Sequence, residues 1–175
     1  MYLDHIKLKE ASLQRAGFEE FIPCTEEEIA ALEYWAGHSF PLSYREFLKW
    51  MGRWGGGLFR GSDCFYDNLK NIQKWAKELL KENKCSESLL ENSFVFLMHH
   101  GYHILFFRFN EGDDPPIYSY LEEMEEPEKS SIQQVYLHFS EFLDSMIEKS
   151  INNSKKRIES GPAWPLRNTP NVLFL

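Results

Sequence analysis

Apolar side chains recur at helical spacing along the first half of the chain. The clearest segment follows Pro41 and places four of them at positions i, i+3, i+4 and i+7 of one helical face, namely Tyr44, Phe47, Leu48 and Met51. The same criterion predicts helices over residues 25–36 and 67–80, and a last helix over residues 140–151. A helix with weaker apolar spacing is expected over residues 3–16.

Short polar motifs indicate where these helices begin. Thr25 followed by Glu28 predicts a capping box, in which Thr25 accepts a hydrogen bond from the Glu28 amide and the glutamate reaches back. Ser43 and Glu46 repeat this spacing and predict a second capping box. Ser140 is the candidate cap of the last helix.

Continuous apolar runs replace the helical spacing in the second half of the chain. Residues 94–99 and 102–109 are apolar on both alternating faces, and His100 with Gly101 between them fits a hairpin turn. A third strand is predicted over residues 117–121, after a turn signal that contains two adjacent prolines.

The order of these elements predicts the fold class. A short fourth strand is expected over residues 135–137, so the strands lie together between an earlier group of helices and one last helix. This order favours an α+β fold with a mixed or largely antiparallel sheet flanked by helices. Without an internal repeat or a low-complexity linker, residues 1–175 are expected to form a single domain.

Aromatic residues make up 15% of the chain, with 14 Phe, 8 Tyr and 5 Trp. Side chains of this size predict a compact core that is filled largely by aromatic rings. The helical spacing places two of the tryptophans, Trp35 and Trp75, on the buried faces of their helices.

The charge of the chain is concentrated in one segment. The chain has 27 acidic and 19 basic residues, a formal charge of −8. The segment from Glu111 to Glu128 contains no Lys or Arg, and its acidic residues are Glu111, Asp113, Asp114, Glu122, Glu123, Glu125, Glu126 and Glu128. The predicted strand over residues 117–121 divides it into two acidic loops. A net-negative chain is a poor general binder of nucleic acid, because affinity for phosphate comes mainly from Lys and Arg.

The sequence favours a cytoplasmic protein. No window approaches 18 uninterrupted apolar residues, so no membrane partner is expected, and the start lacks the basic and apolar regions of a secretory signal. The three cysteines, Cys24, Cys64 and Cys85, are scattered and form no Cys-x-x-Cys motif. They fit reduced thiols better than a disulfide framework or a zinc site.

No motif in the chain indicates catalysis. His99, His100 and His103 could suggest a metal site, but on a strand His100 would point away from the other two, and no acidic residue or cysteine nearby completes a ligand set. The glycines at 55–57 lack the Gly-Lys-Ser/Thr ending of a phosphate loop, and no Gly-x-Ser-x-Gly elbow occurs. We therefore expect no catalytic residues, no cofactor and no metal.

Several core and turn motifs follow one another in an order typical of a known family. They are the acidic helix start at residues 25–29, Glu33, Pro41 with Tyr44, Phe47 and Leu48, the pair Gly55 and Gly56, the hairpin with His100, Gly101 and Tyr102, and the strand at residues 117–120. Together they resemble the SUKH superfamily, the Smi/Knr-like group. The resemblance covers residues 20–147 most clearly, and covers the first 20 residues and the tail after Asn152 less clearly.

This resemblance implies an α+β fold and a role in protein binding rather than catalysis. Many bacterial members of the superfamily are immunity proteins that neutralise a cognate toxin, often a nuclease or a deaminase, whereas fungal members serve as interaction modules in cell-wall signalling. We therefore expect a binding protein of the immunity type, with a toxin domain as its protein partner. An intracellular scaffold or regulatory module is the alternative, and an enzyme is a third, less favoured hypothesis.

The acidic loops are the candidate contact surface. Nuclease toxins tend to be basic, and an acidic inhibitor would associate with them faster through electrostatic steering. The candidate contacts are Asp113, Asp114, Glu122, Glu123, Glu125 and Glu126, with Tyr118 and Tyr120 as candidate aromatic anchors. As the alternative, the acidic residues only aid solubility and the tyrosines pack in the core. The oligomeric state is left open.

Overall fold

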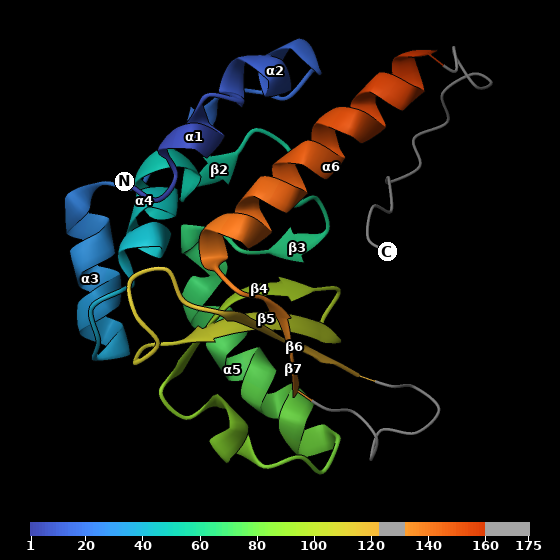
Figure 1. The fold of residues 1–175 in the computed structure, drawn as a ribbon. Helices are drawn as coiled ribbons and strands as arrows, with labels where there is room; N and C mark the ends of the chain where they lie inside the picture. Colours follow the sequence, from blue (N-terminus) through green and yellow to red (C-terminus); the bar gives the residue numbers. More distant parts are fainter. Residues whose placement is uncertain (123–131, 160–175) are drawn as a thin grey trace.

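A five-stranded antiparallel sheet organises the chain (Figure 1). The computed structural model describes residues 1–122 and 132–159. The strands follow one another in space in sequence order: β3 (Ser62–Asp63), β4 (Ser93–His99), β5 (His103–Arg108), β6 (Ile117–Leu121) and β7 (Ile132–Tyr136). A separate ribbon of two short strands pairs β1 (Phe21–Ile22) with β2 (Trp54–Gly55).

Helices cover both faces of this sheet. In chain order they are α1 (Asp4–Lys7), α2 (Glu10–Arg15), α3 (Glu26–Ala36), α4 (Leu42–Met51), α5 (Tyr66–Glu82), the short 3-10 helix η1 (Glu87–Leu90) and α6 (Phe139–Glu159). Figure 1 shows α5 on one side of the sheet, and α4 with the start of α6 on the other. The predicted α+β class and the antiparallel strand order are confirmed, although the first predicted helix is divided into α1 and α2.

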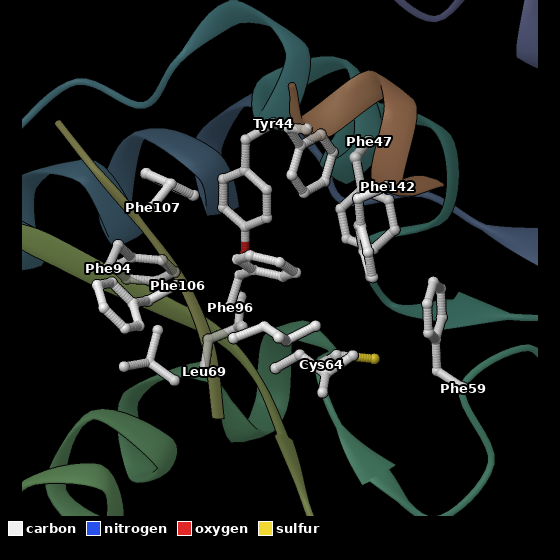
Figure 2. Packing of buried hydrophobic residues seen from close by; sticks show 14 of the residues in the cluster. Tyr44, Phe47, Phe59, Cys64, Leu69, Phe94, Phe96, Phe106, Phe107 and Phe142 are labelled. Atoms are coloured by element: carbon white, nitrogen blue, oxygen red, sulfur yellow. The ribbon is translucent and has the colours of Figure 1, made fainter. Parts of the chain in front are cut away.

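Tyr44 of α4 lies where α4, α6 and the sheet meet. Its side chain is fully buried, and its ring centroid is 5.1 Å from that of Phe107 on β5 and 5.5 Å from that of Phe139 on α6. Figure 2 shows the ring surrounded by other aromatic side chains, including Phe47 and Phe96. The predicted inward face of α4 is confirmed, since all four of its apolar side chains are buried.

The outer edge of β4 is covered partly by a short strand and partly by a side chain. β3 pairs only with Met98 and His99, at the end of β4. Further along the same strand, Gln73 of α5 accepts a hydrogen bond from the Val95 amide (3.0 Å) and donates one to the Val95 carbonyl (2.5 Å). Its amide group therefore makes the pair of bonds that a neighbouring strand would make.

The two predicted capping boxes have different outcomes. Thr25 and Glu28 form the predicted box at the start of α3. The prediction of a second capping box at Ser43 and Glu46 is wrong, because α4 begins after Pro41 and has no side-chain cap. The Glu46 carboxylate, only 8% exposed, instead accepts hydrogen bonds from the amides of Tyr2 and Leu3, both at 2.9 Å, and so attaches the N-terminal segment to α4.

The prediction that Trp35 and Trp75 point inward is also wrong. Their side chains are 46% and 39% exposed. The inner face of α3 is filled by Ile29 and Leu32, and Trp35 lies at the edge of this face, beneath the ammonium group of Lys70 on α5. Trp75 is likewise displaced from the stripe of α5 that packs against β4. Both rings border the core without entering it.

We expect Tyr44→Ala to lower the free energy of unfolding by about 3–5 kcal/mol, because it leaves a large cavity between α4, α6 and the sheet. Tyr44→Phe should change it by less than about 1 kcal/mol, because the hydroxyl makes no hydrogen bond to the described residues. Urea denaturation of the two variants measures the difference. A loss of similar size in Tyr44→Phe would contradict this account of the core.

Candidate partner-binding surface

The acidic turn before β6 holds the N-terminal ends of two helices. The Asp113 carbonyl accepts a hydrogen bond from the Ser43 amide of α4 at 2.9 Å. The Asp114 carboxylate accepts two from Ser140 of α6, from the amide at 3.0 Å and from the hydroxyl at 2.6 Å. Asp114, and not Ser140 as predicted, therefore caps α6. The free amides at the start of a helix and the helix dipole both favour a carboxylate at that end.

Only one of the two aspartates has its carboxylate free for a partner. The Asp113 side chain is exposed and makes no ion pair within residues 1–122 and 132–156. Its contact with α4 uses the main-chain carbonyl and leaves the carboxylate free. The Asp114 side chain is half-buried and occupied by α6. The structure therefore keeps Asp113 as a candidate contact and gives Asp114 a structural role.

Tyr118 lies partly exposed on β6, between charged side chains. The Arg108 guanidinium lies over its ring, 4.3 Å from the centroid, and the Tyr118 hydroxyl donates to Glu111 Oε1 at 3.0 Å. Arg108 Nη1 is 3.4 Å from the same oxygen. Burial, together with the hydrogen bond to Glu111, raises the pKa of Tyr118. These contacts hold the Tyr118 ring in place, as an aromatic anchor for a partner requires. The Glu111 carboxylate is already paired with Tyr118 and Arg108.

Tyr120 does not lie on the surface. Its side chain is fully buried, and its hydroxyl is 3.6 Å from the Cys85 sulfur, in the region after α5. Tyr118 and Tyr120 point to the same face of the sheet, because they are two residues apart on one strand. That face is covered at Tyr120, so Tyr120 is a core residue and not the accessible aromatic anchor that was expected.

The acidic residues at the far end of β6 are separated from the turn. Glu122 is half-buried, and its amide donates to the Tyr102 carbonyl at 2.9 Å, which extends the pairing of β5 with β6. The five residues of β6 place Glu122 about 16 Å from the turn. The remaining candidate contacts, Glu123, Glu125 and Glu126, lie outside the described residues.

Two of the three glutamates in the first turn of α3 are paired with basic side chains of the protein. Glu26 pairs with Arg45 at 2.9 Å and with Lys49, and Glu28 pairs with Arg53. The hydrogen bond from Lys49 lowers the pKa of Glu26, and the bond from Arg53 lowers that of Glu28. These two carboxylates therefore contribute little field to attract a basic partner.

Two histidines of the central hairpin are hydrogen-bonded to serines. His99 Nδ1 is 2.9 Å from the Ser62 hydroxyl, and His103 Nε2 is 2.8 Å from the Ser119 hydroxyl. Burial lowers the pKa of both imidazoles, and the neighbouring His100 and His103 add to the effect on His99. In the part of the chain that the structure describes, no three His, Cys, Asp or Glu side chains form a possible metal site.

Two of the cysteines are buried thiols of low reactivity. Burial raises the pKa of Cys24 to about 12 and raises that of Cys64 as well. A thiol is nucleophilic as its thiolate, so neither side chain is activated near neutral pH. Among the described helices, none is long and apolar enough to cross a membrane.

The family model SUKH_6, described as SMI1-KNR4 cell-wall, matches residues 26–143. The chain belongs to the SUKH superfamily. The family is generally known for immunity proteins rather than enzymes, and it is consistent with a protein of the toxin-immunity type. The part of this SUKH protein that the family model matches runs from α3 into the start of α6, and so includes the turn that caps α6. A search of curated proteins found no match.

Sequence reasoning missed a groove beside Trp35, because it placed this side chain in the core. The groove is bordered by α3, α5 and the start of β4, and its lining includes Phe109 and Lys77. One sequence feature points to this side of α5. Four lysines are spaced so that they lie on one side of the helix, and one of them lines the groove: Lys70, Lys74, Lys77 and Lys81.

We expect Asp114→Ala to lower the free energy of unfolding by about 0.5–2 kcal/mol, the usual cost of losing a helix cap. Asp113→Ala removes the same charge one residue earlier but keeps the main-chain bond to Ser43, so its effect should stay within about 0.5 kcal/mol. Chemical denaturation compares the two variants. Equal losses would show that Asp114 does not act as the cap of α6.

The lowered pKa of His103 predicts a loss of stability in mild acid. Because the pKa of His103 is lowered in the folded state, the unfolded chain takes up the proton first as the pH falls below 6.5. The free energy of unfolding should therefore fall from pH 7 to pH 5, by at most about 1.4 kcal/mol per pH unit for one proton. Denaturation of the wild-type protein and of His103→Gln at several pH values should show a smaller slope for the variant. Identical slopes in the two proteins would contradict the prediction.

Proposed function

We propose that this SUKH protein is a cytoplasmic immunity protein, with residues 1–175 as one domain, that neutralises a cognate toxin by direct binding. The observation that carries the proposal is the family match over most of the folded chain. On this proposal inhibition comes from occlusion and needs no catalytic group or cofactor. A nuclease or deaminase domain is the proposed target, because such a toxin presents a basic surface to its substrate.

The proposed contact surface follows β6. Asp113 at one end and Glu122 at the other flank Tyr118, and Glu123, Glu125 and Glu126 follow Glu122 in the sequence. A span of about 16 Å fits within a standard interface, which buries about 800 Å² on each partner. One partner can therefore touch both acidic groups, with the positioned ring of Tyr118 between them.

A second candidate is an intracellular interaction module without a toxin. The cell-wall description of the matched family favours it. In that case the same face binds a protein of the signalling machinery, and growth in the presence of a toxin does not depend on this chain.

Co-expression tests the proposal against this alternative. The toxin domain encoded beside this protein is expressed in bacteria with and without it. We expect the protein to restore growth and to co-purify with the toxin domain. If it neither restores growth nor co-purifies, the immunity proposal is overturned.

The acidic contacts have a kinetic signature. Changing Glu122, Glu123, Glu125 and Glu126 to Gln should slow association with the toxin domain about tenfold or more at low salt and flatten its salt dependence. A matched control changes four exposed glutamates elsewhere to Gln, namely Glu20, Glu82, Glu87 and Glu91. Stopped-flow association kinetics measure both. If the two variants slow association equally, net charge rather than the β6 segment is responsible.

A further inference from the structure

The groove beside Trp35 has the size of a site for one side chain. Its volume is about 180 Å³, below the roughly 300–1,000 Å³ of most small-molecule sites. Trp35 and Phe109 supply aromatic surface, and Gln73 and Lys77 of α5 supply polar groups. A single large apolar side chain fits this space and composition better than a cofactor does.

The aromatic walls of the groove are held in position. His38 stacks on Phe109 with 4.3 Å between the ring centroids and 14° between the planes. The Lys70 ammonium lies over the Trp35 ring, 5.7 Å from its centroid, and Gln73 is fixed by its two bonds to Val95. Rings held in this way bind an incoming side chain at a small cost in conformational entropy.

A positive stripe runs beside the groove along α5. Its members are separated by four, three and four residues and are all exposed: Lys70, Lys74, Lys77 and Lys81. Lys74 lies 3.6 Å from Glu78, whereas Lys77 and Lys81 pair with no carboxylate among the described residues. In a chain with a net charge of −8, this local excess of positive charge is suited to a negatively charged ligand.

The length of the stripe suits an extended peptide. Lys70 and Lys81 are eleven residues apart on a helix, about 16 Å along its axis. About five residues of an extended chain cover this distance. A peptide that places one side chain in the groove can therefore bring flanking carboxylates to Lys74, Lys77 and Lys81.

We propose that this groove binds an acidic peptide segment of a protein partner, anchored by one aromatic side chain between Trp35 and Phe109. The ligand is opposite in charge to the toxin surface expected at β6, so this site is independent of the proposed function. A single-stranded nucleic acid would also use aromatic rings and lysines, but the net negative charge of the chain disfavours it.

The test uses the full chain and a synthetic peptide with one Phe between two runs of three Glu. In ¹H–¹⁵N NMR spectra, we expect the Trp35 indole N–H resonance, assigned with Trp35→Phe, to shift and saturate during titration. The apparent Kd should rise with salt, because the lysines attract the peptide electrostatically. Replacing the Phe of the peptide by Ala should weaken binding about tenfold, through loss of the aromatic anchor.

A matched pair of variants locates the site. Lys74→Gln with Lys77→Gln should weaken peptide binding about tenfold, whereas Lys149→Gln with Lys155→Gln, the same change of charge on exposed positions of α6, should leave the Kd within about twofold. Circular dichroism checks that both variants are folded. Toxin rescue by the Lys74→Gln, Lys77→Gln variant should be unchanged, which separates this site from the surface at β6.

Three results would overturn the proposal. One is the absence of saturable peptide binding, and another is an equal loss of affinity in the two variants. The third is binding of a peptide with Lys in place of Glu, or of a thymidine oligonucleotide, as tightly as the acidic peptide. Tight oligonucleotide binding would assign the groove to nucleic acid instead.

Discussion

The burial of β4 and β5 on both faces is the constraint on which the rest of the structure depends. Phe94, Phe96 and Phe107 pack with Tyr44 on one side, while α5 packs against β4 on the other. Two apolar faces require helices in two layers, and the long chain segments before and after the hairpin supply them. The turn between β5 and β6 attaches two of these helices to the sheet, because Asp113 accepts a hydrogen bond from α4 and Asp114 accepts one from α6.

Elements with strong local signals were predictable from the sequence. The Thr25 capping box, the inward face of α4 and the strand at residues 117–121 needed only spacing and residue type, and the structure confirms each. Features set by distant neighbours were not predictable. Glu46 turns towards the amides of Tyr2 and Leu3, more than 40 residues away along the chain, and no local pattern contains that partner.

The candidate site shows the same division. Sequence reasoning found the acidic segment but could not separate Asp114, whose carboxylate is used by α6, from Asp113, whose carboxylate is exposed. It also treated Tyr118 and Tyr120 alike. Alternation along a strand tells which face of the sheet a side chain points to, but not whether other residues cover that face. Only the packing of the region after α5 over Tyr120 distinguishes the two rings.

The bonds from Gln73 to Val95 have a consequence for how this protein behaves at high concentration. An uncovered strand edge offers a row of free amides and carbonyls to which a strand of another molecule can add, and growing aggregates exploit such rows. A side-chain amide that occupies both groups of Val95 interrupts this row on β4, outside the part of the strand that pairs with β3. Another molecule that approaches β4 beside Gln73 therefore finds no free backbone pair at Val95.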